Sequence, residues 1–326
     1  MDSPAAGILE SCTSEIPWSA AVFSSREATD VLLATVRALR KCGGASLRVD
    51  VLINGQRGLA DDFLVAARRE PLGLADVRVW FTPYADKAHA WNEYVHRIWD
   101  GRSWAFNVDG YVTVLPGGLH RLRDGLLRDR RLLAATGTPT VGRSSAELRE
   151  TMRRDGGLHG NLFLMTAEAL HSFRNQGIRL PVGLYRTDST IGAVMAFGMD
   201  PRAHDWAPRK YLLVDPDVTW HTPPKVWWHA SELRALLRRS RRQAQGALEN
   251  RAVRYHLAVQ QRSAAELPSN VWSLIDAWRK SDWQDFVRTI TYRPLAWHAW
   301  QQLQSARRQA AIPPAPAALV GSTNGN

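Results

Sequence analysis

The chain has 326 residues, 45% hydrophobic and 22% charged, as is ordinary for a soluble globular protein. It lacks a run of about 18 apolar residues, which excludes a transmembrane helix, and residues 1–20 lack the basic start and apolar stretch of a signal peptide. Its net charge of +11 favours partners that carry phosphate, such as nucleotides, nucleic acid or an anionic membrane. Cys12 and Cys42 have no metal-ligand spacing, so we expect a reduced, cytoplasmic protein.

Strand and helix patterns alternate in the first third of the chain, after residues 1–17, which we expect to form a flexible arm. Apolar alternation predicts strands at 20–25, 47–53, 76–82 and 104–110, with helices at 26–41, 59–69 and 87–100. Ser24 and Glu27 fit a capping box at the start of the first helix. This order predicts right-handed βαβ crossovers and a Rossmann-like α/β sheet, mostly parallel and covered on both faces.

The pattern is less regular after residue 110. It predicts helices at 118–127, 167–175 and 187–198, and strands at 131–137 and 160–166. After residue 216 it is helical, with segments at 231–261, 270–290 and 295–309. Residues 311–326 are rich in Pro and Gly without periodicity, which predicts disorder. We therefore expect a domain over 18–215, a Trp/Arg-rich helical region over 216–310, and a disordered tail over 311–326.

Polar side chains follow each of the first four predicted strands. In an open α/β sheet, ligands bind beyond the carboxyl ends of the strands. The residues in these positions are Ser24, Ser25 and Arg26, then Asn54, then Asp86 and Lys87, then Asp109. They suit a phosphate- or nucleotide-bearing ligand, with Asp109 directed to a divalent cation or a sugar hydroxyl. The chain has neither a dinucleotide glycine fingerprint nor a Walker-type loop, which argues against an NAD enzyme or a P-loop NTPase.

Six segments occur in an order that resembles a known family: "SSREATDVLLATVRAL", "VDVLING", "DKAHAWNEYV", "FNVDGYVTVLPGGL", "GGLHGNLFLMT" and "GLYRTDSTIG". Over residues 18 to about 200 the chain is similar to the inverting family 2 glycosyltransferases, which have the GT-A fold. The resemblance implies that Ser24, Ser25 and Arg26 bind the nucleotide base and ribose. It also implies that Lys87 lies near the base or diphosphate and that Asn92 braces the turn. Asn54 replaces the acidic residue that usually holds the base.

The resemblance assigns Asp109 to the first acid of the family's DxD motif, which binds the metal, the diphosphate and the sugar. Gly110 is the middle residue, and Tyr111 replaces the second acid. A hard oxygen ligand is lost there. Either Asp109 holds Mn²⁺ or Mg²⁺ with help from elsewhere, or dependence on a metal is weak. His221 is a candidate for an additional ligand, although a single His beside Trp220 is more often structural.

Asp188 matches the family's catalytic base, which takes the proton of the acceptor hydroxyl as that oxygen attacks the anomeric carbon. The diphosphate leaves from the opposite side, stabilised by a cation or by Lys/Arg. The alternative is that Asp188 only caps a helix, a task that Thr187 could also perform. Within the loop "DGGLHGN", Gly157, His159 and Gly160 are expected to contact the donor sugar or the acceptor, unless the loop is a mere turn.

The carboxy-terminal third is basic and rich in tryptophan. Eight Lys or Arg between Lys225 and Arg254 stand against Glu232 and Glu249, and eight of the 14 tryptophans lie at or after Trp220. A helical layer packed on the sheet domain is the favoured interpretation of this composition, while contact with an anionic membrane and stacking against sugars are the alternatives.

We therefore expect a cytoplasmic, inverting transferase, with or without peripheral membrane contact. It would move a sugar from a nucleotide-diphosphate donor to a saccharide or lipid-linked acceptor in polysaccharide synthesis. A catalytically weak relative that binds a nucleotide or a glycan is the second hypothesis. A basic nucleic-acid-binding protein is the third, and no zinc finger, RNA-recognition motif or clear helix-turn-helix supports specific binding of nucleic acid.

Overall fold

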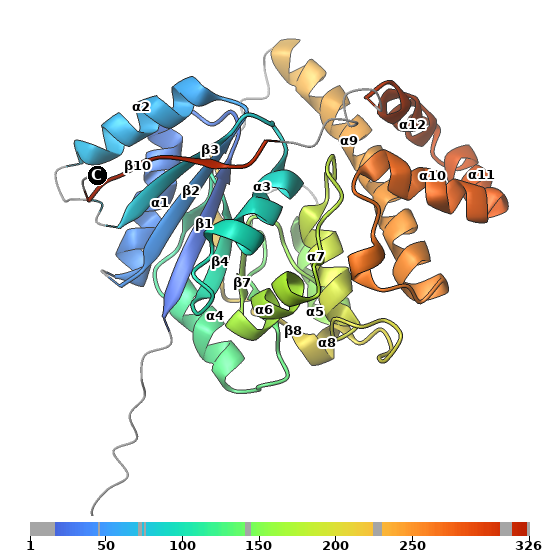
Figure 1. Cartoon of the computed structure of the whole chain (residues 1–326), viewed down its shortest axis with the longest axis horizontal. Coiled ribbons are helices and arrows are strands. Elements are labelled where there is room, and N and C mark those ends of the chain that lie inside the picture. The colour runs from blue at the N-terminus through green and yellow to red at the C-terminus, as the bar shows by residue number, and fades with distance from the viewer. Residues whose placement is uncertain are drawn as a thin grey trace, which may run out of the picture.

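The computed structural model describes residues 17–44, 46–70, 74, 76–140, 145–223, 230–306 and 315–324. Apart from Pro17, the predicted amino-terminal arm lies outside them. An eight-stranded sheet, with strand order β10-β3-β2-β1-β4-β7-β6-β8, forms the centre of the molecule (Figure 1). Its strands are β1 (Trp18–Ser24), β2 (Arg48–Asn54), β3 (Val77–Thr82), β4 (Trp104–Asp109), β6 (Ala134–Thr136), β7 (Leu162–Met165), β8 (Leu212–Val214) and β10 (Ala318–Ser322). A small second sheet pairs β5 (Thr113–Val114) with β9 (Trp220–His221).

The pairing confirms the predicted fold class of a mixed α/β protein with a mostly parallel sheet. Strands β3, β2, β1 and β4 are parallel to one another, whereas β7 runs antiparallel to both β4 and β6. In the register, Phe23 is paired with Asp109 and Asn54 with Thr82. The carboxyl ends of β1 to β4 therefore meet at one edge, as the sequence predicts.

Helices α1 (Thr29–Gly43), α2 (Arg57–Arg68) and α4 (Gly118–Leu127) cover one face of the sheet. Their apolar positions, such as Leu32, Phe63 and Leu122, are fully buried against Val22 and Val51 of the strands. Burial of each such side chain contributes about 1.5–3 kcal/mol. Packing against these helices holds β1 and β2 in place and so fixes the positions at which the loops after these strands begin.

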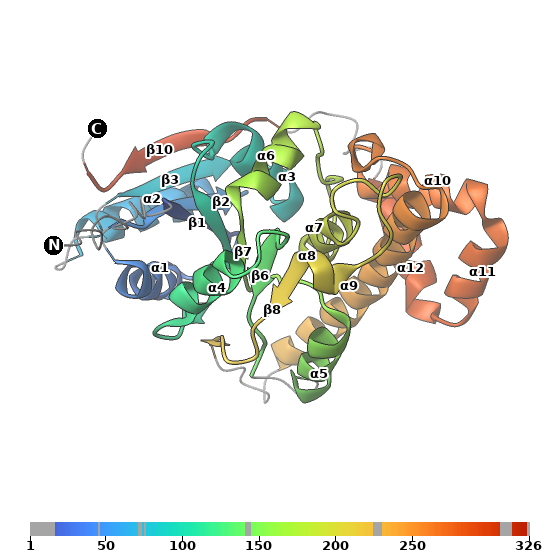
Figure 2. The same cartoon turned by 90° about the horizontal axis from the view of Figure 1, so that it is seen from below.

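Helices α3 (Lys87–Glu93), α6 (Ala167–Asn175) and α7 (Thr187–Ala196) cover the other face, and a π-helical turn, Tyr94–Ile98, extends α3. The same apolar core continues into α9 (Ala230–Arg254), its π-helical extension Tyr255–Val259, α10 (Val271–Ser281), α11 (Trp283–Thr291) and α12 (Pro294–Ala306). Figure 2 shows these helices beside the sheet domain. Trp278 and Trp300 are buried there, each with its ring edge-on to Phe286. The carboxy-terminal helices thus share a core with the sheet domain, and a domain boundary at residue 215 stays a prediction.

Three short helices are absent from the sequence prediction: α5 (Ser145–Asp155), α8 (Pro208–Tyr211) and a 3₁₀ turn at Ala264–Glu266. Helix α5 is missed because it is polar on almost every side, and Met152 is its one buried residue. Without an apolar stripe, a helix gives no periodic signal. The predicted capping box is also wrong, since α1 begins at Thr29 and its cap residue Ala28 makes no side-chain hydrogen bond to the helix.

The predicted disorder of residues 311–326 is wrong for Ala318–Ser322, which form β10 antiparallel to β3. Residues 311–314, 325 and 326 lie outside the described residues. The side chain of Thr323 accepts a hydrogen bond from the Val77 N–H at 3.2 Å, and that of Asn324 accepts one from the Asp76 N–H at 3.0 Å. β3 would otherwise be an edge strand with unpaired backbone groups. The tail strand β10 has little apolar alternation, and it is ordered because it pairs with the backbone N–H and C=O groups at the edge of β3.

Candidate active site

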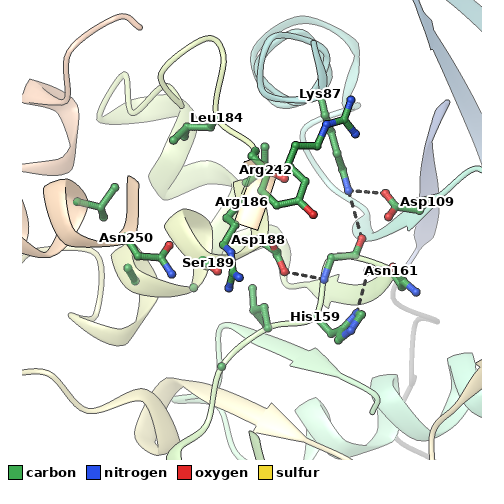
Figure 3. A pocket seen from close by; sticks show the side chains of 18 of the residues that line it. Lys87, Asp109, His159, Asn161, Leu184, Arg186, Asp188, Ser189, Arg242 and Asn250 are labelled. Atoms are coloured by element: carbon green, nitrogen blue, oxygen red, sulfur yellow. Dashed lines mark hydrogen bonds and ion pairs between the residues drawn. The ribbon is translucent and has the colours of Figure 1, made fainter. Parts of the chain in front are cut away.

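A cavity of about 1330 Å³ opens at the carboxyl edge of the sheet, between the ends of β1–β4 and helices α5, α7 and α9. Figure 3 shows residues from widely separated segments meeting around it. Twelve of the predicted site residues line it: Ser24, Ser25, Arg26, Asn54, Asp86, Lys87, Asp109, Tyr111, Gly157, His159, Gly160 and Asp188. The structure therefore brings most of the predicted donor side and the predicted base into one cavity.

Asp109 lies at the end of β4, and hydrogen-bond donors surround its carboxylate. Lys87 Nζ donates to Oδ1, and Tyr111 Oη donates to Oδ2 at 2.9 Å. The amide of Asn161 satisfies its neighbours when Nδ2 faces Oδ2 at 3.3 Å and its oxygen accepts from Trp220 Nε1 at 2.8 Å. Burial, together with the charge of Asp109, raises the pKa of Tyr111, so its phenol stays protonated as a donor.

This environment does not fit a resident divalent cation. Cations of this kind prefer several oxygen ligands, but both oxygens of Asp109 already accept hydrogen bonds, and Tyr111 stands in place of the second acid. Within the described residues, no group of three or more His, Cys, Asp or Glu could hold a metal ion. The ammonium group of Lys87 supplies a positive charge at the position where the DxD resemblance would put a metal.

Asp188 lies in the first turn of α7 and faces the cavity. Its Oδ2 accepts a hydrogen bond from the Gly160 N–H at 2.8 Å, while the Gly160 carbonyl accepts one from Lys87 Nζ at 3.2 Å. Asp188 makes no side-chain cap to its own helix, whose cap residue is Arg186. The carboxylate is thus held from outside the helix and is directed into the cavity, which favours a functional role over simple capping.

The loop after α5 lines the cavity next to Asp188. Gly156 and Gly157 have φ of +79° and +129°, values that favour glycine. His159 Nδ1 accepts a hydrogen bond from the Asn161 N–H at 3.2 Å, and its ring lies 5.0 Å from that of Trp220. Burial lowers the pKa of His159, although the carboxylates of Asp188 and Asp109 oppose the shift. The ring is therefore neutral at neutral pH.

The loop after β1 is held by Glu27 rather than by a helix cap. Glu27 Oε2 accepts from Ser24 Oγ at 2.6 Å, from the Ser25 N–H at 2.8 Å and from the Arg26 N–H at 3.0 Å. Burial disfavours its charge, but these hydrogen bonds outweigh burial and lower the pKa of Glu27. The Arg26 side chain is left exposed at the mouth of the cavity.

Asn54 ends β2 at the cavity wall and is 2% exposed. Its buried Oδ1 has no hydrogen-bond partner among the described residues. An unpaired buried acceptor of this kind costs about 1–3 kcal/mol. A ligand that places an N–H beside Oδ1 would remove that cost, so the observation is consistent with a base-binding role.

Three predicted site residues lie outside the cavity lining. Asn92 is buried in α3, where its side chain exchanges two hydrogen bonds with the Leu180 backbone, which agrees with a bracing role. Gly110 lies behind the cavity, where an added Cβ would stand 2.9 Å from Ser24 Cβ. The His221 side chain is exposed on β9. Asp86 lines the wall, but its carboxylate caps α3 through the His89 N–H and also accepts from the Gly183 N–H.

Sequence reasoning misses the contribution of α9. Glu249 is fully buried and accepts hydrogen bonds from the N–H groups of Tyr185 and Arg186, just before Asp188. Burial raises its pKa to about 7, although these hydrogen bonds favour the charged form. Arg242 and Asn250, also on α9, line the cavity with Arg186. In the sequence, the only signal for these residues is the high charge of the helix, which does not indicate which of its faces meets the cavity.

Comparison with solved structures identifies the same fold in a known enzyme. A mannosyltransferase from Pyrobaculum calidifontis, solved with GDP-Man and Mn²⁺, is 15% identical, with a TM-score of 0.54 over 90% of this chain and 85% of that chain. Glucosyl-3-phosphoglycerate synthase from Mycobacterium tuberculosis, solved with Mn²⁺, UDP-glucose and phosphoglyceric acid, is 11% identical, with a TM-score of 0.48 over 73% of this chain and 79% of that chain. No family model and no curated protein matches the chain. The first of these likenesses confirms the predicted GT-A fold, and these structural neighbours are nucleotide-sugar glycosyltransferases.

Proposed function

We propose that the protein is an inverting glycosyltransferase that moves a sugar from a nucleotide-diphosphate donor to an acceptor hydroxyl. The observation that carries the proposal is the meeting of Asp109 and Asp188 in one cavity, linked through Lys87 and Gly160. The mannosyltransferase of the same fold was solved with a nucleotide sugar, which supports a donor of that class.

The donor is proposed to lie across the ends of β1, β2 and β4. Asn54 Oδ1 would accept an N–H of the base, and the loop at Ser24, Ser25 and Arg26 would enclose the base and ribose. Lys87 and Arg26 are the cations near the diphosphate. A positive charge fixed in place before the reaction stabilises a leaving anion without reorganisation.

Asp188 is proposed to be the general base. Its carboxylate takes the proton from the acceptor hydroxyl as that oxygen forms its bond to the anomeric carbon of the sugar. The bond from that carbon to the diphosphate breaks on the opposite side, so the nucleoside diphosphate departs with the bonding electron pair. The hydrogen bond from the Gly160 N–H holds Asp188 in position and leaves Oδ1 available for the proton. Attack from the face opposite the leaving group inverts the anomeric configuration.

We propose no step that passes through a metal ion. The donor set at Asp109 does not fit one, because Lys87 and Tyr111 already satisfy the carboxylate. The hydrogen bond to Asp109 holds the ammonium group of Lys87 in place, from where it is proposed to stabilise the negative charge of the departing diphosphate.

Peripheral contact with an anionic membrane remains a proposal, supported by exposed aromatic residues near exposed arginines. Trp283 is 56%, Tyr292 81% and Trp297 48% exposed on α11, α12 and the turn between them, and Arg288 and Arg293 lie in the same segment. Among the described residues, no helix is long and apolar enough to cross a bilayer. Flotation with phosphatidylserine vesicles at low salt should carry the protein upward, and Trp283→Ser with Trp297→Ser should abolish flotation. A protein that stays at the bottom of the gradient at low salt would contradict the proposal.

The proposed function is tested by release of nucleoside diphosphate from a panel of nucleotide sugars. We expect slow hydrolysis of one donor in the absence of the acceptor. Calorimetry with the same panel separates an enzyme from an inactive binding protein, since the latter would bind one donor without turnover. Neither turnover nor binding with any donor would contradict the proposal.

A further inference from the structure

A second cavity, of about 1070 Å³, lies against the outer side of α9 and next to the candidate active site. The two cavities share Arg186, Gln243, Asn250 and Arg254 in their linings, so they adjoin one another along α9. One face of α9 and one face of α11 border it. The lining positions on α9 are Gln243, Ala244, Ala247, Asn250, Arg251 and Arg254, and their helical spacing places them on one side of the helix.

The lining is strongly basic. Five arginines, Arg186, Arg251, Arg254, Arg288 and Arg293, stand against the single carboxylate of Asp285. Hydrogen bonds from Arg251, whose Nε lies 2.6 Å from Asp285 Oδ2, and from Arg288 Nη2 at 2.7 Å lower the pKa of Asp285 to about 2, although burial opposes the shift. Asp285 is therefore ionised, and it offsets only one of the five positive charges.

Two of these arginines, Arg254 and Arg293, have no acidic partner among the described residues, while the charge of Arg186 is attracted to the buried carboxylate of Glu249. Among the side chains that the structure describes, no carboxylate lies within ion-pair distance of the guanidinium groups of Arg186, Arg254 or Arg293. Arg254 and Arg293 are exposed at the cavity, and neither has a side-chain hydrogen bond within the same described set. Like charges gathered in a cavity repel one another, so the arrangement favours a bound anion.

Gly246 explains how Arg186 reaches the junction of the two cavities. A Cβ added at Gly246 would stand 2.6 Å from Arg186 Nε, so the glycine leaves room for the arginine against α9. Glycine in a helix interior costs roughly 1 kcal/mol relative to alanine. Arg186 is also two residues before Asp188, which connects the basic cavity to the proposed base.

We propose that this cavity binds a phosphate group of the acceptor, with Arg186, Arg254 and Arg293 as its ligands. The inference rests on the proposed function, because it concerns the acceptor whose hydroxyl would reach Asp188. Guanidinium groups match the geometry of phosphate oxygens through paired N–H donors. The acceptor would then extend from Asp188 along α9, with its hydroxyl in the first cavity and its phosphate in the second. A soluble phosphorylated sugar and a phospholipid headgroup share this chemistry.

The test is calorimetric titration of the full chain with inorganic pyrophosphate, in the presence of excess UDP and GDP to occupy the donor side. We expect the double variant Arg254→Gln, Arg293→Gln to bind pyrophosphate at least about tenfold more weakly than wild type. The control is Arg241→Gln, an exposed arginine of α9 that lines neither cavity, and it should bind as wild type does. Equal affinity in all three proteins, or no binding by wild type, would overturn the inference.

A second arm uses phosphatidylcholine vesicles with and without phosphatidic acid. If the double variant Arg254→Gln, Arg293→Gln loses binding both to vesicles with phosphatidic acid and to pyrophosphate, the result supports the site and shows that a lipid phosphate reaches it. Loss of pyrophosphate binding alone supports the site with a soluble acceptor. Loss of vesicle binding alone overturns it in favour of simple surface contact. Arg254, Arg293 and Arg241 are exposed, and the first two have no acidic partner among the described residues, so the double variant and the Arg241→Gln control should both fold; unchanged melting temperatures check this.

The two experiments distinguish a wrong phosphate site from a wrong proposed function. A protein that releases nucleoside diphosphate from a sugar donor but binds no pyrophosphate in the second cavity would refute the inference alone. A protein that binds pyrophosphate there but neither binds nor cleaves any nucleotide sugar would refute the proposed function.

Discussion

Lys87 and Asp188 are joined through Gly160, whose carbonyl accepts a hydrogen bond from Lys87 Nζ at 3.2 Å and whose N–H donates to Asp188 Oδ2 at 2.8 Å. Lys87 also donates to Asp109. The proposed base and the donor-side carboxylate are therefore held by one chain of contacts. A substitution at any of these residues should therefore alter the position of both Asp109 and Asp188.

Replacement of Lys87 by alanine should lower kcat/KM for the sugar donor by about 10- to 100-fold. The variant loses a charge-assisted hydrogen bond, worth about 1.5–3 kcal/mol, and leaves the charge of Asp109 uncompensated. Lys41→Ala, an exposed lysine on α1, is the matched control and should leave kcat/KM unchanged. Steady-state kinetics with the donor found in the panel provide the measurement.

Because Lys87 stands where a metal would be expected, wild-type turnover should persist in EDTA within about twofold. Nucleoside diphosphate release is measured with EDTA and with added Mn²⁺. Activity that disappears in EDTA and returns with Mn²⁺ would show that the site recruits a cation despite its donor set, and would contradict the role given to Lys87.

Glu249 should make the stability of the protein depend on pH. Its pKa is about 7 when folded against an ordinary value of 4.5, so the folded state binds the proton more tightly than the unfolded state does. This contribution to stability is fully present below about pH 4.5 and is lost as the pH rises to about 7, by up to about 3 kcal/mol. Glu249→Gln removes the titrating group and should flatten this part of the pH profile.

The measurement is urea unfolding of wild type and Glu249→Gln at intervals between pH 5 and 8. Glu168→Gln, an exposed glutamate of α6, controls for the loss of a negative charge. If the free energy of unfolding of Glu249→Gln falls between pH 5 and 7 as steeply as that of wild type, another group is responsible for the pH dependence.

Deletion of residues 315–326 should destabilise the sheet domain. The deletion removes the pairing of β10 with β3 and the hydrogen bond from the Ala317 N–H to Glu93 Oε2, at 2.8 Å. Each hydrogen bond contributes about 0.5–1.5 kcal/mol, and each kcal/mol shifts the melting temperature by about 2–4 °C. Because several hydrogen bonds are lost, calorimetry should show a melting temperature lower by several times this amount. The exposed edge of β3 should also promote aggregation. A melting temperature equal to that of the full chain would mean that β10 adds nothing to stability.

Much of the sheet and of the donor side could be predicted from the sequence, since alternating strands and helices dictate where parallel strands end. That rule brought Ser24, Asn54, Lys87 and Asp109 to one edge. The assignment of Asp188 needed the family resemblance, because nothing in its own helix distinguishes it from a cap. Tyr111 in place of the second acid predicted a weakened metal site but gave no sign that Lys87 would donate a hydrogen bond to Asp109.

The remainder depends on contacts that carry no local pattern. Glu249 is 61 positions from Asp188 in the chain, and its burial follows from how α9 packs against α7. Arg254 and Arg293 share a cavity only after α9 and α11 come together. Strand β10 is formed by residues that lack strand periodicity, because an open edge on β3 provides the partner that their own sequence does not demand.

The central claim is that Asp188 takes the acceptor proton, and Asp188→Asn tests it most directly. Asparagine keeps an oxygen that can accept from the Gly160 N–H, so the fold and the donor affinity should be retained. Loss of a general base lowers kcat by about 10²–10⁴-fold. Asp62→Asn, an exposed carboxylate on α2 outside both cavities, is the matched control. We predict that Asp188→Asn binds the donor as wild type does but loses turnover, while Asp62→Asn retains it; turnover by Asp188→Asn at the wild-type rate would contradict the account.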